Sequence, residues 1–87
     1  MAGTRDDDAA WHAYARAVGT ELHRRRIEAG LTQETLAHLA GMTRSHYRVL
    51  ETGGSATSPA NPTLRAMSRL AAALGIDVQD LLPTTGR

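Results

Sequence analysis

The side chains best suited to binding chemistry in this chain of 87 residues are its arginines, which make up all ten of its basic residues. A guanidinium group can form paired hydrogen bonds with a phosphate group or with the edge of guanine. The same arginine bias would also follow from a GC-rich genome, and composition alone favours that explanation. Without a motif around them, Arg44 and Arg48 would be interpreted as ordinary surface residues.

Catalytic and metal-binding chemistry has little support in the sequence. The absence of cysteine excludes a disulfide framework and cysteine-ligated zinc. The four histidines, at positions 12, 23, 38 and 46, include no pair with the i, i+4 spacing of a helical metal site. No nucleophile, base and orienting group stand in a meaningful arrangement. We therefore expect a protein that is not an enzyme and that holds neither a metal nor a cofactor.

Length and charge set further limits. A chain of 87 residues is expected to form a single domain with a thin core. Its formal net charge of +1 does not by itself suggest a nucleic-acid partner. The sequence contains neither a run of 18 apolar residues nor the apolar stretch of a signal peptide. We therefore expect a cytoplasmic protein without membrane association.

The sequence predicts helices throughout, because Ala, Leu, Arg and Glu dominate and alternating β-branched runs are absent. A first helix is predicted to begin at Asp7 or Asp8 and to reach Ala29, with Gly30 as its stop. Gly19 could divide this segment into two helices, since glycine costs about 1 kcal/mol relative to alanine inside a helix. One face of the segment carries the apolar residues Trp11, Tyr14, Val18 and Leu22.

Shorter elements follow, each bounded by a capping or helix-breaking residue. They are a second helix from the N-cap Thr32 to Gly41, a third over Arg44–Glu51 after the N-cap Thr43, a loop over residues 52–61, a fourth helix from Pro62 to Gly75, and a short last helix from Asp77 to Leu82.

The segment Thr32–Glu51 carries the most specific signal. Two short helices joined by a tight turn that contains glycine form a helix-turn-helix arrangement. Gly41 allows a left-handed conformation at the turn, and Ala37 is small where the two helices must approach closely. The second helix would then present its N-terminal residues outward, and such a helix fits the major groove of B-DNA.

These residues resemble the Cro/CI-type, or Xre, helix-turn-helix family over about residues 18–83. The motifs in common are Arg26–Leu31, Thr32-Gln33-Glu34, Leu36-Ala37, Gly41-Met42-Thr43, Tyr47, Leu50-Glu51, Gly53, Pro62, Leu64, Leu70–Ile76 and Leu81-Leu82. The resemblance implies an all-α fold, a compact five-helix lambda-repressor-like DNA-binding domain with an N-terminal helical extension. The implied division is the extension over residues 1–17, the helix-turn-helix domain over 18–83 and a flexible tail over 84–87.

The resemblance also implies a function and its residues. The chain would be a sequence-specific transcriptional regulator that binds double-stranded DNA as a homodimer. Thr32 and Gln33 match phosphate contacts at a helix N-terminus, and Thr52 and Gly53 match phosphate contacts after the third helix. The outward positions of that third, recognition helix are Thr43, Arg44, Ser45, Arg48 and Val49, with Arg44 as the leading candidate for guanine. His46 also lies near the groove and has no assigned role.

Arg26 and Glu51 match a buried salt bridge of the family, so we assign them to structure. The family pattern leaves three segments open. The loop over residues 52–61 is longer than usual, and Arg24 and Arg25 could face either DNA or solvent. Residues 1–17 precede the usual start, and their Trp11 and Tyr14 either pack on the chain's own core or contact a partner. The alternative function is a protein-interaction module, such as an antitoxin or an adaptor.

Overall fold

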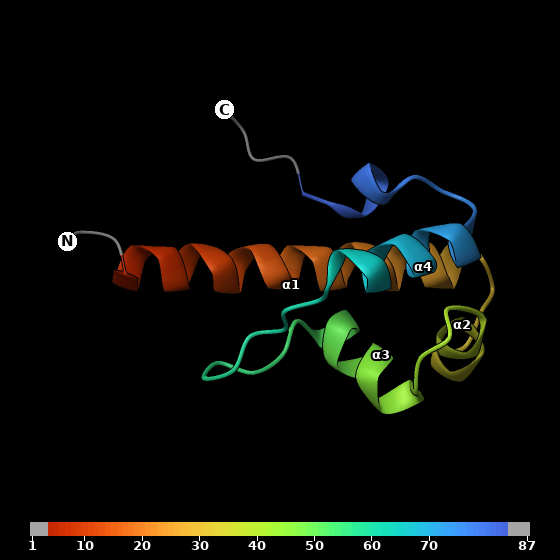
Figure 1. Cartoon of the computed structure of the whole chain (residues 1–87), viewed down its shortest axis with the longest axis horizontal. Helices are drawn as coiled ribbons and strands as arrows, with labels where there is room; N and C mark the ends of the chain where they lie inside the picture. Colours follow the sequence, from red (N-terminus) through yellow and green to blue (C-terminus); the bar gives the residue numbers. More distant parts are fainter. Residues whose placement is uncertain (1–3, 84–87) are drawn as a thin grey trace.

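Four α-helices and one short 3₁₀ helix make up the computed structural model, which describes the backbone of residues 4–83 and the side chains from residue 8 (Figure 1). In chain order they are α1 (Thr4–Glu28), α2 (Gln33–Leu39), α3 (Arg44–Thr52), α4 (Leu64–Leu74) and the 3₁₀ helix η1 (Val78–Leu81). No strand occurs within residues 4–83, where an isolated bridge joins Gly54 to Pro59. The predicted tail at 84–87 lies outside the described residues.

The predicted count of five α-helices is wrong, and the first helix begins earlier than predicted. The last predicted helix is η1, a single 3₁₀ turn. The first segment is one helix of 25 residues that begins at Thr4, before Asp7, and continues through Gly19. The expected boundary between residues 17 and 18 falls inside α1, which is continuous across it.

Gly19 is required for close packing and does not break α1. A Cβ at this position would lie 2.9 Å from the backbone carbonyl oxygen of Leu50 and would overlap the carbonyl of Glu51. The absence of a side chain thus lets the end of α3 rest directly on α1. The cost of glycine within a helix is offset by the contact that it permits.

Threonine side chains begin three of the helices. The hydroxyl of Thr32 accepts a hydrogen bond from the Thr35 amide, and the hydroxyl of Thr43 accepts one from the His46 amide, each at 3.0 Å. Both predicted N-caps are present. α4 begins one residue after its own cap, Thr63, so the prediction that Pro62 lies in its first turn is wrong.

The turn between α2 and α3 is held by its glycine and by backbone hydrogen bonds. Gly41 has a φ of +72°, in the left-handed region that glycine adopts without a steric penalty. The Met42 amide then donates to the Ala37 carbonyl at 2.9 Å. This turn fixes the direction in which α3 leaves α2.

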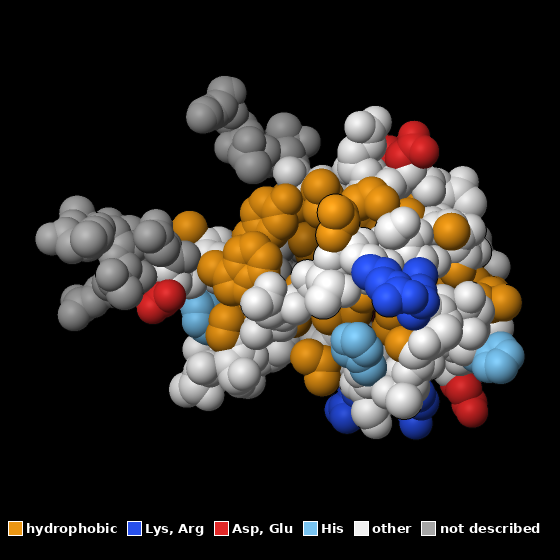
Figure 2. Space-filling view, viewed as in Figure 1, with side chains coloured by type: hydrophobic (Ala, Val, Ile, Leu, Met, Phe, Trp, Pro, Cys, Tyr) orange, Lys and Arg blue, Asp and Glu red, His pale blue; other side chains and the backbone are white. Residues whose placement is uncertain are grey.

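Each of the five helical elements contributes one fully buried large side chain to a single core. These side chains are Leu22, Leu36, Tyr47, Leu70 and Leu81. A band of hydrophobic side chains also reaches the surface on the face shown in Figure 2. Exposed large apolar residues of the molecule include Trp11, Leu64 and Leu82. None of the described helices is long and apolar enough to cross a membrane.

The connection between α3 and α4 starts later than predicted, because Thr52 still belongs to α3. Its return toward α4 is anchored on the N-terminal half of α1. The Trp11 indole N–H donates to the backbone carbonyl of Ala60 at 3.0 Å, and the Trp11 ring stacks on Tyr14 with a centroid distance of 5.6 Å. Ala60 is buried. The long connection is thus tied to α1 at its far end.

Candidate nucleic-acid interface

α3 has two faces of opposite character. Its 3.6-residue period turns Tyr47 and Leu50 into the core. Arg44, Ser45 and Arg48 are exposed on the other side. Arginine side chains project from the lower edge of the view in Figure 2, where Figure 1 places α3. The remaining residues predicted at or near the groove, Thr43, His46 and Val49, are also exposed.

The arginines on this outer face differ from those at the end of α1 in their charge partners. Within the described residues, neither Arg44 nor Arg48 forms an ion pair. Arg24 and Arg25, near the end of α1, do form ion pairs. Arg24 pairs with Glu21 and with Glu28, and Arg25 pairs with Glu21, at 2.8 Å for the last two contacts. The guanidinium groups of Arg44 and Arg48 are therefore available to an anionic or base partner, unlike those of Arg24 and Arg25.

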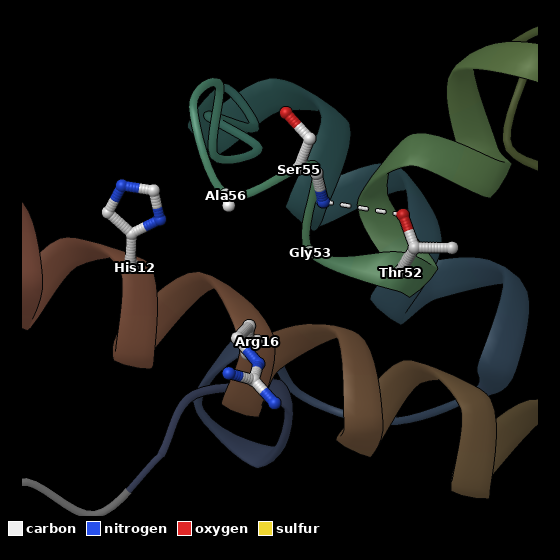
Figure 3. A pocket seen from close by; sticks show the side chains of 7 residues that line it. His12, Arg16, Thr52, Gly53, Ser55 and Ala56 are labelled. Carbon is white, nitrogen blue, oxygen red and sulfur yellow. Dashed lines mark hydrogen bonds between the residues drawn. The ribbon is translucent and has the colours of Figure 1, made fainter.

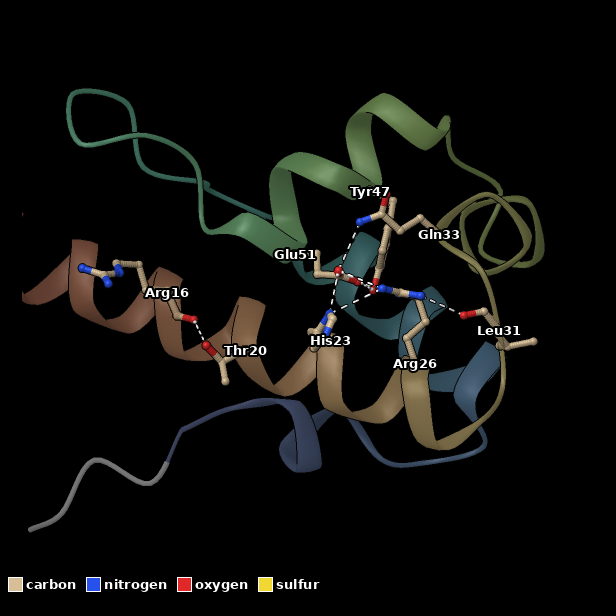
Figure 4. Close-up of polar contacts among 8 residues, drawn as sticks. All are labelled: Arg16, Thr20, His23, Arg26, Leu31, Gln33, Tyr47 and Glu51. Atoms are coloured by element: carbon tan, nitrogen blue, oxygen red, sulfur yellow. Dashed lines mark hydrogen bonds and ion pairs between the residues drawn. The ribbon is translucent and has the colours of Figure 1, made fainter.

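A buried carboxylate holds α3 against α1 and α2 (Figure 4). Glu51 accepts two hydrogen bonds from the Arg26 guanidinium, at 2.7 and 3.1 Å, and one from the Tyr47 hydroxyl at 2.6 Å. The Gln33 side-chain amide donates to it at 3.1 Å, and the His23 Nδ1 lies 3.0 Å away. This set of side chains, which we call the Glu51 cluster, joins three helices at one point.

The predicted partners Arg26 and Glu51 are thus in contact and largely buried, with side chains 10% and 7% exposed. Arg26 also donates to the backbone carbonyl of Leu31 at 2.8 Å, which fixes the turn that leads into α2. A buried ion pair of this kind is stable only when the remaining hydrogen-bonding groups are satisfied. No buried side-chain nitrogen or oxygen within the described residues lacks a partner.

The ionisation of these side chains reflects their surroundings. Burial disfavours the Glu51 carboxylate, but the hydrogen bonds from its partners outweigh this effect and lower the pKa of Glu51 to about 2. The hydrogen bond to Glu51 raises the pKa of Arg26. Burial, followed by the hydrogen bond to Glu51, raises the pKa of the Tyr47 hydroxyl above its usual range. Arg26 and Glu51 therefore stay charged near neutral pH.

The predicted phosphate contacts at the start of α2 have defined positions. The Thr32 hydroxyl is occupied as the N-cap of α2, while its side chain remains exposed. Gln33 is half-buried because its amide nitrogen reaches Glu51. The Glu51 cluster thereby sets the orientation of Gln33 relative to α3.

The residues after α3 line a cavity of about 330 Å³ against α1 (Figure 3). The Thr52 hydroxyl is exposed at its edge, donates to the Val49 carbonyl at 3.1 Å and accepts from the Gly54 amide at 3.3 Å. Gly53 is buried with a φ of +85°, and its amide caps α3 by donating to the same Val49 carbonyl. Gly53 thus has no free amide with which to hold a phosphate.

Three features of this region did not emerge from the sequence. Tyr47 was named only among the family motifs, although its position four residues before Glu51 places both on one side of a helix. The contact of His23 with Glu51 has no comparable local signal, because it joins α1 to α3. Arg16 beside the cavity had no motif to mark it.

Two capped helices joined by a glycine turn, with unpaired arginines on the outer face of the second, define a helix-turn-helix protein of the nucleic-acid-binding class. The helix-turn-helix family model matches residues 22–81. The chain therefore belongs to the Xre, or Cro/CI-type, helix-turn-helix family. No curated protein sequence matches it significantly.

The solved structures that are similar to this chain include two regulators. The restriction-modification controller protein C.AhdI from Aeromonas hydrophila is 35% identical with a TM-score of 0.70, over 78% of this chain and 96% of that one. The hypothetical transcription factor NHTF from Neisseria is 28% identical with a TM-score of 0.68, over 85% of this chain and 80% of that one. Neither is described as an enzyme. The family and these neighbours support a DNA-binding transcriptional regulator.

Proposed function

We propose that this chain regulates transcription by binding double-stranded DNA sequence-specifically as a homodimer, with α3 in the major groove. The outer face of α3 is the observation that carries the proposal. Arg44 and Arg48 are exposed there beside Ser45, and neither arginine has an ion-pair partner among the described residues. An unpaired guanidinium on a recognition helix is suited to the two acceptors of guanine.

The proposed roles follow the positions along α3. Arg44, in the first turn, is the leading candidate to read guanine, with Ser45 and Arg48 as further contacts to base edges. Val49 can offer only apolar contact, so its proposed target is a thymine methyl group. Thr43 and His46 lie at the start of the same exposed face and complete the proposed contact surface.

The flanking contacts would go to the sugar-phosphate backbone. Thr32 and Gln33 stand at the N-terminus of α2, where backbone amides and the helix dipole favour an anion. Thr52 takes this role after α3, while the buried Gly53 serves to shape the turn beside it. Such contacts position the protein, and the base contacts specify the sequence.

A homodimer is the proposed active form. Two recognition helices in one dimer would lie about 34 Å apart, one turn of DNA, on a palindromic operator. Apolar side chains such as Leu64, which is 76% exposed, offer surface that a second copy would bury. Because the proposed target is DNA, we expect the protein in the cytoplasm.

Genome-wide DNA enrichment followed by footprinting tests this proposal. We expect enrichment of a small set of sites and a footprint with two-fold symmetry over two successive major grooves. Analytical ultracentrifugation of the protein with one such site should give two chains per duplex. Uniform, sequence-independent protection of DNA would overturn the proposal.

A protein-interaction module, such as an antitoxin or an adaptor, is the second candidate. The exposed apolar side chains favour it, including Trp11, of which 37% remains exposed beside Tyr14. Co-purification from the native host separates the two functions. A stoichiometric protein partner without DNA enrichment would favour the interaction module.

A further inference from the structure

One wall of the cavity between α1 and the end of α3 comes from residues that precede the family match. Two of its lining residues, His12 and Arg16, come from α1 before residue 22, where the family match begins. The opposite wall is formed by residues 52–56 (Figure 3). The extension of α1 therefore brings a basic side chain to the edge of the proposed interface.

Arg16 carries a positive charge that no described residue pairs with, and its backbone is held against the turn after α3. It is exposed and forms no ion pair with a described residue. A Cβ on Gly53 would lie only 2.9 Å from the Arg16 Cα, so the backbone of the turn rests directly on this part of α1. Asp8 lies eight residues earlier, about 12 Å along the helix, a distance at which salt screens most of its charge.

The cavity adjoins a second hollow on the outer face of α3. This second hollow, lined by Ser45, Arg48 and Val49, shares Thr52, Gly54 and Ser55 with the first. The shared residues thus lie between the proposed base-reading residues and the cavity that Arg16 lines. Arg16 belongs to α1, and its backbone meets Gly53, the residue that caps α3.

The hydrogen-bond donors at this site are limited. The Thr52 hydroxyl donates to Val49, and the Ser55 hydroxyl oxygen accepts from the Ser58 amide at 3.0 Å. These groups shape the turn. The Ser55 hydroxyl accepts without giving up its own proton. The guanidinium of Arg16 and the imidazole of His12 supply the other side-chain donors along the cavity, from one helix and four residues apart.

We propose that Arg16, assisted by His12, binds a backbone phosphate of the DNA next to the bases read by α3. The inference rests on the proposed function and adds a contact from the N-terminal extension. A guanidinium forms strong charge-assisted hydrogen bonds with phosphate oxygens. A phosphate contact carries no sequence information, so it would strengthen binding to all DNA and fix the register of α3.

The test measures the affinity of the full chain for its best DNA site over a range of salt concentrations. Arg16→Gln removes the charge but keeps most of the side-chain stem beside Gly53. We expect it to weaken binding about tenfold, equally for specific and unrelated DNA, and to lower the salt slope by about one. Arg69→Gln is the matched control, because Arg69 is an exposed arginine of α4 that lines neither hollow. It should leave both quantities unchanged.

A second experiment locates the contact. Single phosphates of the site are replaced by neutral methylphosphonates, and each duplex is measured with the parent and with Arg16→Gln. One flanking replacement should weaken the parent but not the variant. If every replacement weakens both proteins equally, Arg16 contacts no phosphate and the inference is wrong.

Two further outcomes separate this inference from others. Failure of both the parent and Arg69→Gln to bind any DNA would overturn the proposed function itself.

Inorganic phosphate can be titrated at constant ionic strength while the NMR signals of His12 are observed. Shifts that depend on Arg16, together with unchanged DNA binding by Arg16→Gln, would assign the cavity to a free anion and overturn the DNA contact.

Discussion

The two faces of α3 use charge in opposite ways. On the inner side, the carboxylate of Glu51 is buried and accepts hydrogen bonds from three other side chains at 2.6 to 3.1 Å. On the outer side, Arg44 and Arg48 are exposed and have no ion-pair partner among the described residues. One helix of nine residues thus carries a buried charge held by hydrogen bonds on one side and exposed charges without ion pairs on the other.

This difference shows which charges shape the protein and which can serve a partner. The inner carboxylate must stay paired, because an isolated buried charge is costly. The outer arginines keep their hydration until a partner replaces it. Substitutions on the inner side should therefore change stability, whereas substitutions on the outer side should change binding alone.

Glu51→Ala should give the largest loss of stability. It leaves the Arg26 guanidinium buried without its counter-charge, and breaking such a pair costs about 3–5 kcal/mol. Urea unfolding followed by circular dichroism measures the change. Glu28→Ala is the control, since Glu28 pairs with Arg24 on the exposed side of α1, and such a pair contributes little. If the two substitutions lowered the stability equally, burial of the Glu51 ion pair would not make it more important for stability than an exposed ion pair.

The pH dependence of stability should report the same carboxylate. The pKa of Glu51 is about 2 in the folded protein, below its ordinary value of 4.5. Its contribution is therefore fully present above pH 4.5 and is lost as the pH falls toward 2. The difference corresponds to about 3 kcal/mol. Urea unfolding between pH 7 and pH 2 should show this loss. In Glu51→Gln, the free energy of unfolding should depend less steeply on pH over the same range.

Gly19→Ala tests how closely the inner side of α3 rests on α1. Helix propensity alone predicts that alanine would stabilise α1 by about 1 kcal/mol. The added Cβ would instead meet the backbone of Leu50 and Glu51, so we expect a loss of about 1–3 kcal/mol. The sign of the change in the thermal unfolding temperature decides between stabilisation by helix propensity and destabilisation by the close contact. Thr20→Ala, at an exposed neighbour, controls for propensity.

Gly19 also illustrates what the sequence could and could not provide. Threonine caps, helix periods and glycine turns are local signals, and they correctly predicted α2, α3 and the turn between them. The role of Gly19 depends on α3, more than 30 residues away, so the local pattern left a break open at a position where the structure has a contact. The anchoring of Ala60 by Trp11 is hidden for the same reason.

The residues of the candidate site also differ in whether a local sequence signal could predict them. The partnership of Arg26 with Glu51 came from the resemblance to a family, because residues 25 positions apart share no local period. The exposure of Arg44 and Arg48 follows from the period of α3 itself. Arg16 had neither signal, since it lies before the region matched by the family and meets Gly53 only in the folded chain.

Arg44→Ala should have the smallest effect on stability of these substitutions, within about 0.5 kcal/mol, because the side chain is exposed. Its effect should appear in binding, where the loss of a bidentate contact to guanine costs about 1–3 kcal/mol and relaxes the preference at one base pair. Competition binding against a library of single-base variants measures both. Arg69→Ala removes an equivalent exposed charge from α4 and should leave affinity and preference intact. If Arg44→Ala keeps the affinity and selectivity of the parent, the outer face of α3 does not read bases through this residue, and lack of a charge partner is then no guide to function here.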